Sequence, residues 1–517
     1  MLMSFISVKF LLFLLTGVLI YYALPVRYRG FLILPMNLLF YVFSGWKGLI
    51  WITLTAFISW TGAGLMQRQQ DHCRQERKRL KEAGYKGMEF REKEKPAKAR
   101  MTRHNRVFLT AGILAAVGIW AFFKNARGSI AVPLAISYYT FMAVSYMADV
   151  YNRKYSAEKN FLRYYTWLTF FPQMVEGPFS RYDKQAVQLA AVHRFDSEIF
   201  SKGCLRILCG YCKKLVLADY LWLIISFYLE NEKGPAYQTL LLVVLLPLQQ
   251  YADFSGCMDI AIGTAGLFGI RLPENFRSPV FSQSVDEVWR RWHITLGAFC
   301  KDYIFYPVAL LKNLNHATAK IFRRKPAAGQ KIPVLTALFC VWTFIGLWHG
   351  FAWKYLIWGW MNLFFISSGI LLSPIYASWK KQLHIQADGR AWKLFCMVRT
   401  YLIFGIMELV SDSASASAAF RRFISFFQRS GWRLQNNGYA ISLLPGTTVR
   451  GTAAAAVVAA AVLAIDILKE NNMDVYDSLR HVPLLPRYLL YIAALFMIVL
   501  FCPSGENINA GFAYANF

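Results

Sequence analysis

The sequence predicts an all-α, polytopic membrane protein, and three features of its composition support that prediction. The 517 residues are 56% hydrophobic and only 17% charged, whereas soluble domains carry about 25% charged residues. Apolar stretches recur from end to end, many of them close to the roughly 20 residues that a helix needs to cross a bilayer. The net charge of +28 is concentrated between these stretches, as the positive-inside rule describes.

The composition also excludes several classes of protein. A disordered chain would be polar and poor in aromatic residues, but 16% of this chain is aromatic. A nucleic-acid-binding domain would gather its basic residues on one solvated surface, and here they lie between apolar spans. The nine cysteines are scattered and odd in number, which is not the pattern of a disulfide framework.

Twelve apolar segments are predicted to span the membrane. The first, Phe5–Leu24, runs directly into Pro25 without the small-residue cleavage site of a signal peptide, so we interpret it as an uncleaved helix. Several segments are short, so we expect tilted helices or buried half-helices among them. The other predicted spans are Gly30–Phe43, Gly48–Met66, Val107–Phe123, Ile130–Val150, Leu215–Leu229, Tyr237–Ala252, Pro333–Trp348, Trp353–Leu372, Trp392–Val410, Thr452–Leu468 and Tyr488–Cys502.

The charges between the spans predict their orientation. Residues 67–106 contain fourteen Lys and Arg against six Asp and Glu, a net charge of +8, so we expect a cytoplasmic loop there. Counting spans from this loop places both the N-terminus and the C-terminus outside the cytoplasm. The same count puts Arg27 and Arg29 inside, in agreement with the rule.

Two segments do not have the pattern of simple spans. Phe170–Gly177 ends in Glu-Gly-Pro, and Asp253–Pro273 contains four glycines and two aspartates. Irregular backbone at membrane depth is tolerated only where it is buried in protein or lines a watery cavity. We therefore expect both segments to dip into the membrane and line an internal site. A surface helix in the headgroup plane is the alternative.

Motifs for several common kinds of catalysis are absent from the sequence. It contains no HExxH or Cys/His spacing typical of a zinc site, no GxSxG of a serine hydrolase and no GxxxxGK[ST] phosphate loop. Asp253 and Asp259 could form a carboxylate pair. At positions i and i+6 they would not share a helix face, and Gly256 between them argues against a regular helix.

Among the eight histidines, His349 is distinctive because apolar segments flank it on both sides. An ionisable side chain within a membrane usually faces the protein interior or a wet cavity, and desolvation disfavours the charged imidazolium. A neutral imidazole there could act as a general base for a hydroxyl nucleophile. It could equally be a structural histidine bonded to a carbonyl, and the residues alone leave both interpretations open.

His293 is the second candidate, because Trp289, Arg290, Arg291 and Trp292 precede it directly. Two guanidinium groups beside two indole rings could hold an anionic group through charge-assisted hydrogen bonds. Trp and Arg also collect at membrane interfaces, so the cluster could instead anchor a helix there.

Short motifs follow one another in order along the chain. They are Ile136-Ser-Tyr-Tyr-Thr-Phe, Phe171-Pro-Gln-Met-Val-Glu-Gly-Pro178, Gly210-Tyr-Cys-Lys-Lys214, Tyr251-Ala-Asp253-Phe-Ser-Gly256, Pro273-Glu-Asn275-Phe, Trp289-Arg-Arg-Trp-His293 and Gly346-Leu-Trp-His349-Gly. Their order and spacing resemble those of the membrane-bound O-acyltransferase (MBOAT) family, in the branch typified by alginate O-acetyltransferase. The resemblance is strongest over about residues 130–365, and the ending Phe512–Phe517 is also similar to this branch.

The resemblance implies a ring of about 12 transmembrane helices, with re-entrant segments, around a central funnel. It implies an acyl donor such as acetyl-CoA or another acyl thioester, reached from the cytoplasm, with no bound cofactor and no metal. The acceptor would be an exported cell-surface polysaccharide, and an extracytoplasmic partner acyltransferase generally assists in this branch. His349 corresponds to the family's near-invariant histidine, expected as the general base, and His293 to its second histidine. We expect six further residues to bind substrate, namely Trp289, Arg290, Arg291, Asp253, Asn275 and Trp348.

We expect four parts in the chain: N-terminal transmembrane helices (1–66), a basic cytoplasmic loop (67–106), a catalytic core (107–410), and a C-terminal loop with transmembrane helices (411–517). Departures from the family pattern bear on the acceptor, since Asn362 stands where a histidine is common and Glu176 where a small residue is common. Two rival functions remain: D-alanyl transfer toward teichoic acid, and a transporter or lipid flippase. The transporter is disfavoured because the sequence shows no two-fold repeat.

Overall fold

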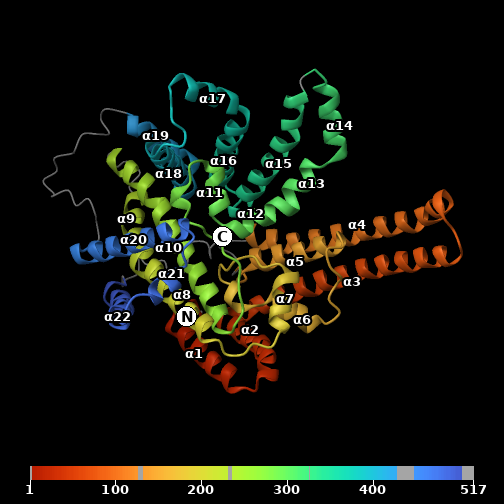
Figure 1. The fold of residues 1–517 in the computed structure, drawn as a ribbon, viewed down its shortest axis with the longest axis horizontal. Helices are drawn as coiled ribbons and strands as arrows, with labels where there is room; N and C mark the ends of the chain where they lie inside the picture. Colours follow the sequence, from red (N-terminus) through yellow and green to blue (C-terminus); the bar gives the residue numbers. More distant parts are fainter. Residues whose placement is uncertain (1–2, 126–131, 231–235, 325, 428–446, 503–517) are drawn as a thin grey trace. The chain divides into compact units, whose positions relative to one another are not determined.

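The structure is a computed structural model that describes residues 3–125, 132–230, 236–324, 326–427 and 447–502, and all regular elements in these ranges are helices (Figure 1). The prediction of an all-α protein is confirmed. The chain divides into two compact units, Met1–Phe200 with Thr264–Pro273, and Ser201–Gly263 with Glu274–Phe517. The ending Phe512–Phe517, which resembles the family, lies outside the described residues.

Each unit is built from helices that follow one another along the chain. The longer helices of the first unit are α1 (Val8–Ala23), α2 (Arg29–Gly45), α3 (Lys47–Glu82), α4 (Gly87–Asn125), α5 (Ile136–Tyr151), α6 (Phe161–Leu168) and α7 (Tyr182–Ala190). The helices of the second unit are α8 (Ser197–Tyr211), α9 (Asp219–Glu230), α10 (Ala236–Leu267), α11 (Val285–Arg291), α12 (Ile294–Cys300), α13 (Tyr306–Ala309), α14 (Lys312–Ile321), α15 (Pro326–His349), α16 (Trp353–Leu371), α17 (Ser373–Gln382), α18 (Arg390–Asp412), α19 (Ala416–Phe427), α20 (Val449–Glu470), α21 (Val475–Arg480) and α22 (Leu484–Phe501). Of these, α8 begins just before the unit, and α10 ends just beyond its first segment.

Several of these helices have the length and composition of membrane spans. Within the described ranges, seven helices are long and apolar enough to cross a bilayer, or up to nine if each of two bent helix pairs counts as one span. This agrees with a multi-pass membrane protein. Four predicted spans coincide with shorter helices, because α1, α2, α5 and α9 have only 12 to 17 residues. The number of about twelve spans therefore stays a prediction.

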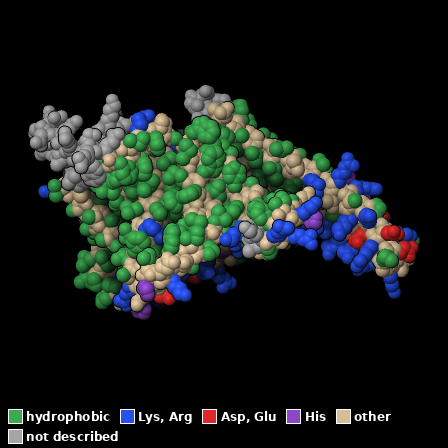
Figure 2. All heavy atoms as spheres, turned by 90° about the horizontal axis from the view of Figure 1, so that it is seen from above, with side chains coloured by type: hydrophobic (Ala, Val, Ile, Leu, Met, Phe, Trp, Pro, Cys, Tyr) green, Lys and Arg blue, Asp and Glu red, His purple; other side chains and the backbone are tan. Residues whose placement is uncertain are grey.

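The basic segment 67–106, expected as a loop, is mostly helical, because α3 continues to Glu82 and α4 begins at Gly87. The segment is rich in Lys, Arg, Glu and Gln, which are good helix formers. An ion pair of 3.3 Å between Arg77 and Glu94 joins the two helices. Figure 2 shows Lys and Arg side chains gathered along the projecting ends of these helices. The connection between the two apolar segments is therefore itself built from helix, and its cytoplasmic position stays a prediction.

The segment Phe170–Gly177 is buried and is not a simple span, as the sequence predicts, since it consists of a short 3-10 helix over Phe171–Gln173 followed by a turn. Asn37 of α2 holds it, since its Oδ1 accepts the N–H of Phe171 at 3.0 Å. The side chain of Gln173 donates to the carbonyl of Trp167 at 3.1 Å. A Cβ on Gly177 would lie 2.2 Å from the Cα of Gln173, so only glycine fits this bend.

The prediction of broken backbone over Asp253–Pro273 is wrong for most of that range, because α10 continues through it to Leu267. Two of its four glycines, Gly256 and Gly263, serve helix packing instead. A Cβ on Gly256 would lie 2.9 Å from the carbonyl oxygen of Gly210, and one on Gly263 would lie 2.6 Å from that of Gly203. Glycines spaced by seven on α8 and on α10 thus let the two backbones approach closely, as small residues do between membrane helices.

Candidate active site

His293 lies at a sharp turn between α11 and α12. Its backbone is left-handed, with φ of 47°. A non-glycine residue in this conformation costs on the order of 1–3 kcal/mol, and such residues cluster at functional sites. The imidazole is only 3% exposed. The fold thus stabilises a strained turn that places this ring in the interior of the second unit.

Asn275 fixes that turn from the preceding loop. Its backbone carbonyl accepts the N–H of Ile294 at 3.0 Å, and its Oδ1 accepts the N–H of Thr295 at 3.0 Å and the hydroxyl of Thr295 at 2.9 Å. Its side-chain amide lies 3.1 Å (Nδ2) and 3.2 Å (Oδ1) from Nδ1 of His293. Because Nδ1 faces Asn275, Nε2 is the ring nitrogen directed away from it. In the structure, Asn275 orients the imidazole.

The aromatic residues before His293 connect the turn to three other helices. The indole N–H of Trp289 donates to Oδ1 of Asn362 on α16 at 2.8 Å. The ring of Trp292 packs on Tyr251 of α10 at 6.0 Å and on Phe404 of α18 at 5.4 Å between centroids. These contacts place the aromatic part of the motif in the packed interior rather than at an exposed interface.

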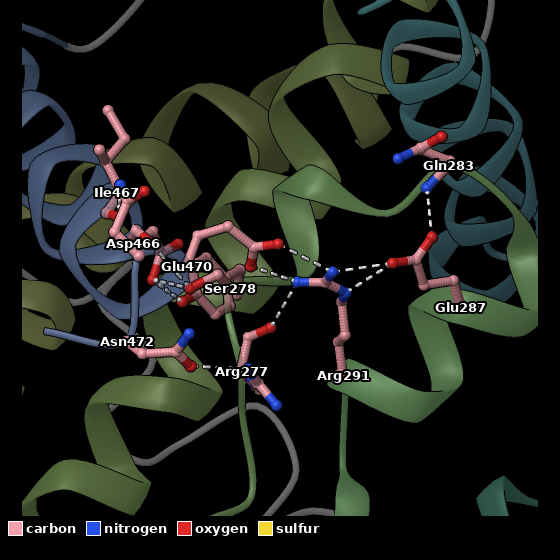
Figure 3. A network of polar contacts seen from close by, with 11 residues as sticks. Arg277, Ser278, Gln283, Glu287, Arg291, Asp466, Ile467, Glu470 and Asn472 are labelled. Carbon is pink, nitrogen blue, oxygen red and sulfur yellow. Dashed lines mark hydrogen bonds and ion pairs between the residues drawn. The ribbon is translucent and has the colours of Figure 1, made fainter. Parts of the chain in front are cut away.

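The two arginines, which we expected to contact substrate, form ion pairs within the protein. Arg291 bonds to Glu287 of its own helix at 2.8 Å and to Glu470 of α20 at 2.6 Å (Figure 3). Arg290 is exposed and pairs with Asp286 at 2.8 Å, one turn earlier. The guanidinium of Arg291 therefore ties the His293 turn to α20, and its charge is balanced by two carboxylates.

His349 is the last residue of α15, and α16 begins at Trp353. Two glycines let these helices pack closely. A Cβ on Gly346 would lie 2.7 Å from the carbonyl oxygen of Tyr355, and one on Gly359 would lie 2.5 Å from that of Trp342. His349 is 7% exposed, so the tight hairpin holds it in a largely buried position.

Aromatic rings surround the imidazole of His349. Centroid distances are 4.7 Å to Trp348, 4.8 Å to Trp358 and 6.0 Å to Tyr355. The ring of Trp348 also lies 6.1 Å from that of His293. The fold therefore brings the two histidines of the sequence analysis to one indole, although they come from separate segments.

Asp253, another residue expected to bind substrate, is fully buried on α10. Its carboxylate lies 2.5 Å from the ammonium of Lys214, which also lies 2.8 Å from Asp219. The adjacent Lys213 pairs with Asp259 at 2.7 Å. Lys213 and Lys214 lie in a π-helical turn, Cys212–Ala218, that continues α8, and each of the two aspartates of α10 meets its own lysine.

Glu408 of α18 was not identified from the sequence. Its Oε1 accepts the indole N–H of Trp358 at 3.0 Å, one ring away from His349. The signal was present, because an acidic residue inside an apolar span is in itself an indicator of function. Asn362 was noted only as a departure from the family pattern, but it bonds to Trp289.

The second unit also contains a cavity of about 420 Å³. Ile294, the residue after His293, lines it. Two of its cations, Lys469 and Arg277, form no ion pair with any residue that the structure describes. The charged residues that line it are Lys202, Arg206, Lys213, Arg277, Lys469, Asp259, Glu274 and Asp474, so the lining is net positive.

The two imidazoles are candidates for proton transfer in this unit. A buried neutral imidazole can accept the proton of a hydroxyl group, and an imidazole held at one nitrogen can present the other to a reactant. Within the described residues there is no group of three or more His, Cys, Asp or Glu that could hold a metal ion.

Comparison with known proteins gives consistent matches. A protein of Azotobacter vinelandii named "probable alginate O-acetylase" is 27% identical over 445 residues, covering 81% of this chain and 76% of that protein. A protein of the same name from Pseudomonas aeruginosa is 30% identical over 327 residues, covering 62% and 56%. The teichoic acid D-alanyltransferase of Bacillus subtilis is 26% identical over 232 residues, covering 44% and 56%.

The family comparison matches residues 36–323 to "MBOAT, membrane-bound O-acyltransferase family". This range is more than half of the chain, and it includes His293 and ends before His349. The class of enzyme is therefore that of the O-acyltransferases, which transfer an acyl group to a hydroxyl. The chain belongs to the membrane-bound O-acyltransferase family.

Proposed function

We propose that this enzyme transfers an acetyl group from a cytoplasmic thioester toward hydroxyls of an exported cell-surface polysaccharide, with His349 as the general base. The observation that supports this most is the burial of His349 and His293 against one indole, Trp348, in a chain of this family. The relatives named for alginate acetylation support the acetyl group and the polysaccharide.

In the proposed reaction, the imidazole of His349 accepts the hydroxyl proton as the oxygen attacks the thioester carbonyl. A C–O bond forms, the C–S bond breaks, and the proton passes from the imidazolium to the leaving thiolate. His293, held through Nδ1 by Asn275, is assigned to orient the reacting groups from the other side of Trp348. The acyl group moves from sulfur to oxygen with no net change in protons.

The positively charged cavity supports a donor that carries phosphate groups, as acetyl-CoA does. Lys469 and Arg277 line it without an ion-pair partner among the described residues, and charge-assisted bonds to phosphate are strong. The double variant Lys469→Gln/Arg277→Gln should bind acetyl-CoA at least about tenfold more weakly, whereas Lys469→Arg should keep most of the affinity. Calorimetry on the purified protein checks this, and equal affinity of the double variant would exclude the cavity as the donor site.

Deletion of the chain, followed by mass analysis of the esters released from cell-surface polymers, tests the proposal. We expect acetyl esters to disappear and to return when the chain is restored. Loss of D-alanine esters with intact acetyl esters would instead favour the second candidate, D-alanyl transfer toward teichoic acid. The similarity to the Bacillus subtilis enzyme supports this candidate. The transporter hypothesis gains no support from the family match.

The proposal also includes the orientation of the chain in the membrane and a partner protein outside the cytoplasm. The net charge of +8 on residues 67–106 supports a cytoplasmic position for the ends of α3 and α4, and with twelve spans both termini are extracytoplasmic. An extracytoplasmic partner acyltransferase is proposed from the resemblance to the alginate branch alone. Cysteine labelling of intact cells at either terminus tests the orientation.

A further inference from the structure

Glu408 is an acidic side chain inside the apolar helix α18, and it is only 3% exposed. An ionisable group within a membrane span is costly, and such groups are usually retained for function. One oxygen, Oε1, accepts the indole N–H of Trp358 at 3.0 Å. The hydroxyl of Ser411 is shared between the other oxygen, Oε2, at 3.3 Å and the backbone carbonyl of Glu408 at 3.0 Å. Both carboxylate oxygens therefore have defined partners.

Trp358 lies between this carboxylate and the imidazole of His349. It lies on α16, is nearly fully buried, and meets the ring of His349 at 4.8 Å with an interplanar angle of 69°. An indole can rotate about its side-chain bonds unless packing or a hydrogen bond fixes it. The bond to Glu408 therefore joins α18 to the ring that packs against the imidazole of His349.

The end of α18 is itself held by neighbouring helices. Asp412, one turn after Glu408, accepts the side-chain N–H of Gln250 on α10 at 2.6 Å. Lys354, in the first turn of α16, donates to the carbonyl of Ser413 at 2.9 Å. A group that orients a catalytic residue must be supported in this way, because a loosely held support transmits no geometry.

We infer that Glu408 is a positioning residue for His349 and acts through the hydrogen bond to Trp358. The inference rests on the proposed function, since it takes His349 as the general base. It assigns Glu408 no contact with substrate. Misplacement of a reacting group by about 1 Å can cost on the order of 100-fold in rate, so a loss of about tenfold or more is expected when the indole is released.

Three variants separate positioning from packing. Glu408→Leu removes the acceptor, and Trp358→Phe removes the donor but keeps a ring beside His349. Each leaves one buried polar group without its partner, so each also lowers stability. The double variant Glu408→Leu/Trp358→Phe removes both partners and leaves neither of them unsatisfied, so it should be more stable than the single variants. The activity of the double variant therefore decides whether the hydrogen bond matters for catalysis.

The readout is the amount of ester-linked acyl groups on cell-surface polymer, at matched levels of protein in the membrane. We expect the double variant to be folded but at least about tenfold less active. Glu408→Gln should restore activity to near the wild-type level, because its amide oxygen accepts from the indole and its NH₂ donates to Ser411. Thr343→Val is the matched control, since it removes a similar bond to Trp360 on the same hairpin, 3.1 Å long and outward-facing.

Two results would overturn the inference. Wild-type activity in the folded double variant would show that the bond only satisfies buried polar groups. Equal losses in Glu408→Gln and in the double variant would show that the acceptor is not what matters. His349→Ala, measured in parallel, keeps the two proposals apart: if it is inactive while the double variant is fully active, the general base stands and the role of Glu408 fails.

Discussion

Replacing His349 by alanine is expected to reduce acyl transfer by about 100-fold or more, because general bases contribute roughly 10²–10⁴-fold. The ring is almost buried and packed between Trp348 and Trp358, so no water-exposed base can take its place. The rate is measured in membrane vesicles as label transferred from acetyl-CoA to polymer. Because the substitution removes one side chain at the end of α15, the helical hairpin should still form.

His316→Ala is the matched control for this prediction. This histidine is exposed on α14, and no described contact links it to the site. We expect its rate to equal that of the wild type. If both alanine variants transferred label equally well, the imidazole of His349 would have no chemical role.

Replacing Gly256 by leucine is expected to abolish the folded protein. A Cβ there would already lie 2.9 Å from the carbonyl of Gly210 and 3.2 Å from Cβ of Lys213. A larger side chain would push α10 away from α8 and separate Lys213 and Lys214 from their aspartates. Breaking a buried ion pair costs about 3–5 kcal/mol, a large part of the roughly 5–15 kcal/mol that stabilises a folded domain.

The fraction of detergent-extracted protein that elutes as a single species, together with its melting temperature, measures this effect. Gly369→Leu is the control, because this helical glycine of α16 has no atom within 4 Å of an added Cβ. It should be neutral or slightly stabilising, since leucine favours helices over glycine. A Gly256→Leu protein that melts like the control would contradict the close packing of α8 and α10.

The helices could be predicted from the sequence because the length of an apolar segment is a strong local signal, and the predicted spans do fall on helices. Glycine and charge were less reliable guides. The glycines of α10 suggested broken backbone, but Gly256 and Gly263 face Gly210 and Gly203, and a partner helix cannot be identified from one segment. The pairing of α3 with α4 beyond the apolar segments was not predictable, because single-sequence patterns do not show which charges of residues 67–106 pair across two helices.

The site was partly predictable for a similar reason. His349 and the segment around His293 are unusual in themselves, since one is ionisable between apolar stretches and the other follows two Trp and two Arg. The roles of their neighbours depend on tertiary contacts. Arg291 meets Glu470, from a distant part of the sequence, and the side chain of Asn275 contacts the ring of His293. Only the fold shows that Trp348 lies against both imidazoles.

The most direct test is the ester content of cell-surface polymer in the deletion strain and in four strains that carry the wild-type chain, His293→Ala, His349→Ala or both substitutions. If the two imidazoles serve one reaction, His349→Ala should match the deletion strain and the double variant should be no lower, because groups that act as a unit are not additive. His293→Ala should fall between these and the wild type. Wild-type amounts of ester from His349→Ala, at equal protein in the membrane, would contradict the assignment of the base.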